Sequence, residues 1–190
     1  MNDIKVPFID LKQRFQEEKT EILNVIEKVL TSGHLVLTDE LAEFENKVSS
    51  YTGSPYCLGL NSGTDALMMA MMAAGVKKGD EVITSPVSFV ATVGSICHIG
   101  AIPVFVDTGD DMNISANQIE QAITSKTKAI MPVHWIGRVA NMEKILEVAK
   151  KYNLIVIEDS AQSMGSYYGD QHGGTFGICG AISFHPLKNL

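Results

Sequence analysis

The sequence has few cysteines, and their arrangement indicates neither a disulfide framework nor a metal site. Its three cysteines, Cys57, Cys97 and Cys179, are an odd number, lie far apart and form no C-x-x-C pair. The five histidines include no H-x-x-x-H pair of the kind that holds zinc. We therefore expect reduced thiols and no metal.

The sequence also lacks an excess of basic residues and any long apolar run. It has 15 Lys and Arg against 22 Asp and Glu, a formal net charge of -7, so we expect no binding to a nucleic-acid phosphate backbone. No window reaches the roughly 18 apolar residues of a membrane span, and no apolar signal core follows a basic start. These absences predict a soluble cytoplasmic protein.

Two common enzyme motifs are missing as well. The stretch GGTFGICG, residues 173–180, is not a G-x-G-x-x-G between a strand and a helix, so it does not indicate a dinucleotide site. It is more typical of a turn that leads into a strand. There is no G-x-S-x-G elbow either, so hydrolase chemistry has no support.

The patterns that are present predict an α/β protein. Residues 11–30 and 39–51 carry apolar side chains at helical spacing, which predicts two helices lying on a core. From about residue 56 the apolar residues gather in short runs, most of which do not alternate, as in strands buried on both faces of a parallel sheet. The runs are YCLGLN, EVITSP, IPVFVD, KAIMPVH, LIVIED and CGAISF.

Helical patterns separate these expected strands. Residues 64–75 and 88–100 are mostly apolar, whereas 115–124 and 141–152 are amphipathic and start at the N-cap residues Ser115 and Asn141. Repeated strand-helix-strand units predict a doubly wound sheet with helices on both faces. In such a sheet, ligands collect beyond the carboxyl ends of the strands.

A turn that could hold a phosphate follows the first run. In NSGTDA the N–H groups of Gly63, Thr64 and Asp65 begin a helix, where the free donors and the helix dipole favour an anion. An ordinary helix cap explains the same residues, and because Ser-Gly-Thr is a common sequence the motif alone slightly favours that simpler explanation.

An acid and a lysine follow two later runs. Glu158 and Asp159 end LIVIED, and strand alternation sends their side chains to opposite faces. Lys188 follows CGAISF; such a lysine usually extends into water, but in a dry pocket it becomes a nucleophile for carbonyl groups. A phosphate site, an acid for a protonated ring nitrogen and a lysine for an aldehyde together suggest pyridoxal 5'-phosphate. His134 and His185 also follow strands, although a structural role is commoner for such histidines.

A wider pattern supports this interpretation. It comprises NSGTDALMMAM, KKGDEVITSPVSFVAT, GAIPVFVD, TKAIMPVHWIG, VIEDSAQSMGSYY and SFHPLKNL, together with SGHLVLTDELAEFE near the start. In order and spacing these stretches resemble the sugar aminotransferase family named DegT/DnrJ/EryC1/StrS. The resemblance covers nearly the whole chain.

The resemblance implies a fold, an activity and a set of roles. It implies the type I fold of pyridoxal phosphate enzymes, a homodimer with its active site at the interface, and transfer of an amino group from L-glutamate to a nucleotide-linked keto sugar. The products would serve surface polysaccharides such as lipopolysaccharide, or glycosylated metabolites. It implies that Lys188 bears the cofactor and carries the proton, that Asp159 pairs with the ring nitrogen, and that Gln162 binds the ring hydroxyl. It also implies that Phe89 stacks on the ring and that Ser183, with Gly63, Thr64 and Asp65, binds the phosphate.

The resemblance also implies that this chain is the N-terminal part of a larger unit. Residues 1–52 would form N-terminal helices and residues 53–190 an α/β core, with a C-terminal half to follow. Met164 stands where many relatives have histidine.

Two alternative functions stay open: another pyridoxal phosphate reaction, such as sugar dehydration or aromatic amino acid synthesis, and a regulatory relative without catalysis. Lys188 argues against the dehydratase branch, which has histidine in its place.

Overall fold

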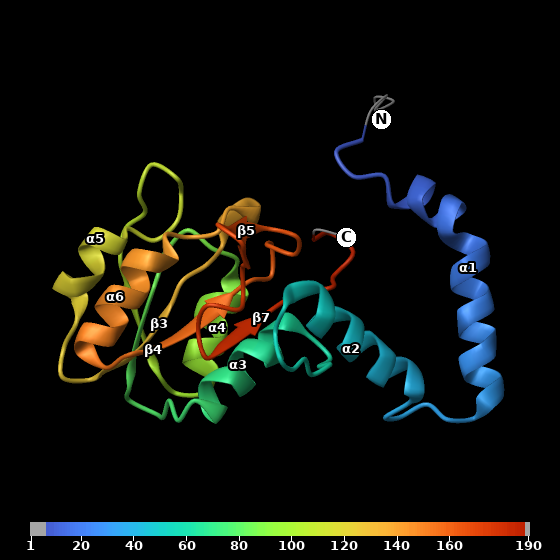
Figure 1. Ribbon diagram of the computed structural model, residues 1–190, viewed down its shortest axis with the longest axis horizontal. Helices are drawn as coiled ribbons and strands as arrows, with labels where there is room; N and C mark the ends of the chain where they lie inside the picture. The colour runs from blue at the N-terminus through green and yellow to red at the C-terminus, as the bar shows by residue number, and fades with distance from the viewer. Residues whose placement is uncertain (1–6, 189–190) are drawn as a thin grey trace.

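The computed structural model describes residues 7–188, and its centre is a parallel sheet. The strands lie in the order β2-β1-β3-β4-β7, and every neighbouring pair is parallel. Their bounds are β1 Glu81–Thr84, β2 Ile102–Phe105, β3 Thr127–Met131, β4 Ile155–Asp159 and β7 Cys179–Ala181. The parallel sheet predicted from the apolar runs is therefore present; the chain passes from β1 to β2, from β2 to β3 and from β3 to β4 through helical segments, and reaches β7 through the loops after β4 (Figure 1).

Helices cover both faces of this sheet. On one face α3, Gly63–Ala73, packs against α4, Val90–His98, and on the other α5, Ala116–Ile119, packs against α6, Met142–Tyr152. Shorter elements complete the fold: the 3-10 turns η1, Glu120–Ala122, and η2, Trp135–Gly137, and a two-stranded antiparallel hairpin of β5, Tyr167–Tyr168, and β6, Gln171–His172. The doubly wound architecture expected from the sequence is confirmed.

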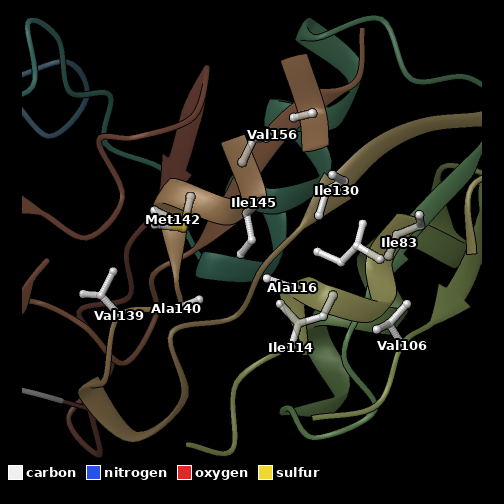
Figure 2. Packing of buried hydrophobic residues seen from close by; sticks show 12 residues of the cluster. Ile83, Val106, Ile114, Ala116, Ile130, Val139, Ala140, Met142, Ile145 and Val156 are labelled. Atoms are coloured by element: carbon white, nitrogen blue, oxygen red, sulfur yellow. The ribbon is translucent and has the colours of Figure 1, made fainter. Parts of the chain in front are cut away.

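Successive strand residues divide the core into two clusters. Val82 and Ile157 face the α3 and α4 side, whereas Ile83 and Val156 face the α5 and α6 side. Figure 2 shows the second cluster, in which Ile145 of α6 lies over the sheet. Because both faces are covered, each strand is apolar at consecutive positions rather than at alternate ones.

The N-terminal helices form as predicted, but the first one does not lie on this core. Helix α1 spans Leu11–Ser32 and α2 spans Asp39–Thr52. Helix α1 has no buried residue among those described, and Figure 1 shows it standing apart from the α/β body. Leu30, for instance, is 61% exposed. The helical spacing was thus right, whereas the prediction that α1 packs on the core was wrong for this chain.

The first apolar run does not become a strand. Residues 55–60 have no regular secondary structure, and Tyr56 and Leu58 are 83% and 80% exposed. A cavity lies between this segment and β7, so the segment has no neighbouring strand with which to form a ladder. Its apolar alternation met the local requirement for a strand but not the need for a partner.

The two predicted helix caps differ. Asn141 caps α6 through its Oδ1, which accepts the N–H of Lys144 at 3.2 Å. Ser115 precedes α5 but makes no side-chain cap bond, and α5 has only 4 residues before the chain tightens into η1.

None of the described helices is long and apolar enough to cross a membrane.

Candidate functional site

A large cavity opens at the carboxyl ends of β4 and β7. Its volume is about 1400 Å³, and it reaches from the N-terminus of α3 to the end of the described chain. Seven of the eight residues proposed from the sequence line it: Gly63, Thr64, Phe89, Asp159, Gln162, Ser183 and Lys188. The eighth, Asp65, is not among the lining residues. The fold thus gathers in one cavity residues that lie up to 125 positions apart in the sequence.

Asp159 is the buried acid of this cavity. Its Oδ2 accepts the hydroxyl of Thr92 at 2.5 Å, and its Oδ1 accepts the N–H of Ala161 at 3.2 Å. Burial raises the pKa of the carboxyl, and the hydrogen bonds from Thr92 and Ala161 oppose that rise. A cationic ring nitrogen placed against this acid would supply the charge that the buried carboxylate lacks.

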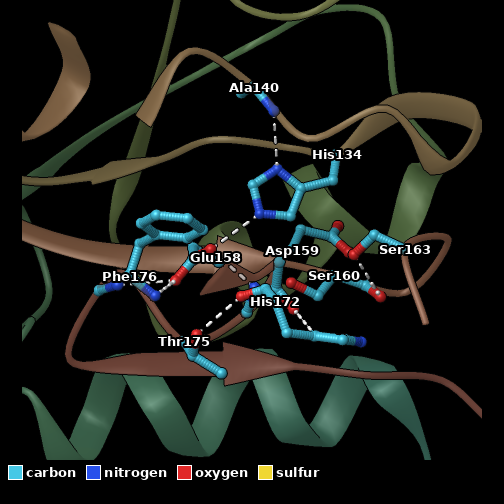
Figure 3. Close-up of polar contacts among 12 residues, drawn as sticks. His134, Ala140, Glu158, Asp159, Ser160, Ser163, His172, Thr175 and Phe176 are labelled. Atoms are coloured by element: carbon cyan, nitrogen blue, oxygen red, sulfur yellow. Dashed lines mark hydrogen bonds and ion pairs between the residues drawn. The ribbon is translucent and has the colours of Figure 1, made fainter. Parts of the chain in front are cut away.

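The neighbouring acid, Glu158, points to the opposite face, as strand alternation predicts. Figure 3 shows its carboxylate enclosed by His134 and the loop before β7. Its Oε2 lies 2.8 Å from His134 Nε2 and from the Gly174 N–H, and its Oε1 accepts the N–H groups of Phe176 and Gly177 at 2.7 and 2.6 Å. Glu158 is therefore a structural anchor with every acceptor position directed at protein.

His134 completes that anchor. Its Nδ1 accepts the N–H of Ala140 at 3.2 Å, so the ring proton lies on Nε2 and is donated to Glu158. His134 is fully buried and does not line the cavity, which confirms the structural role. His185 does line the cavity, where its Nδ1 accepts the N–H of Leu187 at 3.2 Å.

The first turn of α3 has the form of an anion site. Ser62 caps the helix by accepting the N–H of Asp65 at 3.1 Å, so that donor serves the cap. Within residues 7–188 the N–H groups of Gly63 and Thr64 have no protein acceptor. A Cβ built on Gly63 would lie 3.4 Å from the Cβ and 3.7 Å from the Oγ of Ser183, so the Ser183 hydroxyl stands close to the turn.

Lys188, Phe89 and Gln162 surround the rest of the cavity. The Nζ of Lys188 lies 5.2 Å from the centre of the Phe89 ring, at a distance typical of a cation-π contact. The Oε1 of Gln162 accepts the N–H of Ile136 at 3.0 Å, which leaves the amide NH₂ group as a donor. Ile136 holds this position with a φ of 48°, a left-handed conformation that is rare for a β-branched residue.

These residues fit pyridoxal phosphate. The Gly63 turn and Ser183 suit its phosphate, the buried Asp159 suits a protonated ring nitrogen, and Lys188 is the primary amine that its aldehyde requires. No cluster of metal-ligating side chains occurs among the described residues. A parallel α/β sheet with this set at its carboxyl edge defines the class of pyridoxal phosphate enzymes.

Comparison with known proteins places the chain within that class. The profile of the DegT/DnrJ/EryC1/StrS aminotransferase family matches residues 16–190, and the chain belongs to this family. The chain is 43% identical over 188 residues to a "Pleiotropic regulatory protein" of Geobacillus stearothermophilus, and 42% identical to a UDP-N-acetyl-3-dehydro-alpha-D-glucosamine 3-aminotransferase of Acidithiobacillus ferrooxidans. These matches cover 98% and 97% of the chain but 50% of each relative.

Solved structures agree. The crystal structure of S. venezuelae DesV in complex with a ketimine intermediate matches with a TM-score of 0.92 and 36% identity, over 97% of this chain and 50% of that one. A solved relative from Streptococcus pneumoniae is described in a PLP form and a PMP form, and the family is one of pyridoxal phosphate-dependent aminotransferases. The chain spans about half the length of the relatives it matches.

Sequence reasoning missed two residues of this site. Thr92 holds the carboxylate of Asp159, and Ser88 lies 2.5 Å from the Thr92 hydroxyl. Their spacing of four residues puts both hydroxyls on one side of the chain entering α4, a signal that is visible in SFVAT. The partner of those hydroxyls lies 67 residues further along, so the pattern alone could not identify it.

Proposed function

We propose that the complete protein transfers an amino group from L-glutamate to a keto sugar carried on a nucleotide. The family supports the reaction type, and relatives named for UDP- and dTDP-linked sugars support the acceptor class. The observation that carries the proposal is the cavity that brings Asp159, Lys188 and the Gly63 turn together. The amino sugar formed would enter a surface polysaccharide such as lipopolysaccharide, or a glycosylated metabolite.

The residues of the cavity have distinct proposed roles. When bound, pyridoxal phosphate supplies the aldehyde that carries the amino group and a ring that withdraws electrons from the reacting carbon. Asp159 holds the proton at the ring nitrogen, which keeps the ring electron-poor. The free amide NH₂ of Gln162 donates to the ring hydroxyl, and Phe89 covers one ring face.

Lys188 is the proposed catalytic residue. Its Nζ would hold the cofactor at the aldehyde, and once the donor's amine has taken that place the freed amine would accept the proton that leaves the donor's α-carbon. Glutamate would leave as 2-oxoglutarate, whose new carbonyl oxygen comes from water, and its amino group would stay behind. The keto sugar then takes up that amino group by the reverse steps and loses its oxygen as water, so the two halves balance.

The proposal includes a homodimer of longer chains, with the active site at the interface. Helix α1 supports this, because its apolar residues Phe15, Ile26 and Leu30 are exposed in the described chain. The unpartnered segment 55–60 supports it too, since a strand from further along the chain could fill the space beside β7.

We place the protein in the cytoplasm, where its three free cysteines would stay reduced.

Mass spectrometry tests the cofactor link directly. The complete protein is incubated with pyridoxal phosphate, reduced with borohydride and digested, and we expect a pyridoxyl group on the peptide that contains Lys188. Lys188→Ala should remove the adduct, whereas Lys126→Ala, which changes an exposed lysine outside the cavity, should keep it. An unlabelled Lys188 in a folded wild-type protein would refute the proposal.

Turnover tests the substrates. Production of 2-oxoglutarate from glutamate, dependent on UDP- or dTDP-linked keto sugars, is the expected result.

A second candidate function is that of a regulatory protein, because one relative carries that name. If regulation were the function, Lys188→Ala would leave it intact, and no keto sugar would draw an amino group from glutamate.

A further inference from the structure

A chain of two hydroxyls leads from the wall of the cavity to the buried acid. Ser88 is half-buried and lines the cavity, and its Oγ lies 2.5 Å from the Oγ1 of Thr92. Thr92 is fully buried, and its hydroxyl lies 2.5 Å from the Oδ2 of Asp159. No other side chain among the described residues donates a hydrogen bond to the Asp159 carboxyl.

The direction of these bonds follows from the number of protons. An ionised carboxylate can only accept, so the single proton of the Thr92 hydroxyl goes to Asp159. The Thr92 oxygen is then left as an acceptor, and Ser88 donates to it. A donor already polarised by another hydroxyl binds an anion more strongly, which favours the charged form of Asp159.

Helix α4 itself does not need the hydrogen bond from Thr92 to Asp159. A threonine or serine inside a helix commonly donates to a carbonyl of the preceding turn, as Ser95 does to the Thr92 carbonyl at 2.8 Å. Thr92 instead donates to a strand residue 67 positions away. Ser95 is therefore a matched control on the same helix, equally buried and bonded only locally.

We propose that Thr92 and Ser88 are positioning residues that orient the Asp159 carboxylate and keep it ionised for the cofactor's ring nitrogen. This inference rests on the proposed function, because it assigns a purpose to the acid in that reaction. Thr92 fixes the Oδ2 side of the carboxylate and the Ala161 N–H fixes the Oδ1 side, so the group cannot rotate away from the cavity.

Other charges near Asp159 act in a known direction. Lys188 favours its ionised form, as His134 would if it were protonated, while burial opposes ionisation most strongly. The carboxylate of Glu158 points to the other face of β4 and is held there by His134 and backbone N–H groups. Loss of the Thr92 hydroxyl would therefore leave burial less opposed, and Asp159 would stay protonated up to a higher pH.

The pH dependence of cofactor affinity tests this proposal. A protonated Asp159 must release its proton before it can pair with a protonated ring nitrogen, so affinity falls as the pH drops through the pKa of Asp159. In the complete protein, Thr92→Val should weaken pyridoxal phosphate binding about tenfold at neutral pH, the value of one lost hydrogen bond to a charged group. The acid-side fall in affinity should begin at a higher pH than in the wild type.

Three further variants separate positioning from folding. Thr92→Ser keeps the hydroxyl and should restore the wild-type affinity and pH dependence. Ser88→Ala removes only the half-buried hydroxyl and should shift both in the same direction as Thr92→Val, by less. Ser95→Ala should match the wild type. Circular dichroism of each variant confirms that it is folded.

A second readout needs no cofactor. In the cofactor-free protein with ¹³C-labelled aspartate, the carboxyl signal of Asp159 should titrate at a higher pH in Thr92→Val than in the wild type. Wild-type affinity and wild-type titration in both Thr92→Val and Ser88→Ala would overturn the inference and leave the proposed function standing. A wild-type protein that takes up no pyridoxal phosphate would overturn the proposed function, and the inference with it.

Discussion

Glu158→Gln should destabilise the protein far more than its near-identical shape suggests. The carboxylate of Glu158 is fully buried and accepts from His134, Gly174, Phe176 and Gly177. Glutamine keeps one oxygen, which can still accept from two of these donors. Its NH₂ group must then face the other two donors. Because donor faces donor in both contacts, no hydrogen bond forms there.

The cost follows from the number of bonds lost. Two charge-assisted hydrogen bonds disappear, and two buried donors are left without an acceptor, so we expect a loss of about 3 kcal/mol or more in the free energy of unfolding. That is a large part of the roughly 5–15 kcal/mol that stabilises a typical domain. The anchored loop leads into β7, so the loss should extend to the edge of the sheet that borders the cavity.

Urea unfolding of the cofactor-free protein measures this loss. Glu81→Gln is a suitable control, because Glu81 begins β1, is only partly buried and accepts a solvent-exposed hydrogen bond from the hydroxyl of Thr124. That variant should lose less than about 1 kcal/mol. If Glu158→Gln lost no more than Glu81→Gln, the reasoning about the Glu158 anchor would be wrong.

Three more predictions follow from the structure. Burial raises the pKa of Asp159, so the free energy of unfolding of the cofactor-free wild type falls as the pH rises through that pKa. Melting curves should therefore show that Asp159→Asn is at least as stable as the wild type at neutral pH. This advantage should vanish below about pH 4, where Asp159 is protonated in the unfolded chain as well. Asn141→Ala should cost about 1 kcal/mol in urea unfolding and Ser115→Ala almost nothing, because only Asn141 makes its cap bond. Ile136→Asn should raise the urea midpoint by an amount worth about 1 kcal/mol, since Asn tolerates the left-handed backbone.

The sequence predicts the sheet well because strand burial is a local property. Runs such as LIVIED are apolar at every position, which requires cover on both faces, and β4 has that cover from α3 and α6. The segment YCLGLN shows the limit of this reasoning. Its pattern suits a strand, yet a strand needs a neighbour, and a neighbour cannot be deduced from the segment's own residues.

Site residues were predictable where the chain's own geometry directs them. Asp159 ends β4 and Lys188 follows β7, and the carboxyl ends of these neighbouring parallel strands meet at one edge, so their common cavity follows from the topology. The contacts of Thr92 and Ile136 were not predictable, because each depends on the docking of elements 67 and 26 residues apart. The left-handed backbone of Ile136 also contradicts its residue type, and no local pattern announces it.

The end of β4 shows how two adjacent acids acquire different chemistry. Glu158 and Asp159 share a strand, a degree of burial and a residue class, but alternation turns them to opposite faces. On one face protein donors satisfy all of the Glu158 carboxylate, so its charge has no capacity left for a ligand. On the other face Asp159 receives two donors and borders the cavity, so burial leaves its charge only partly compensated. A cation that entered the cavity would gain most at Asp159, which is why the acid with fewer partners is the one suited to hold the ring nitrogen.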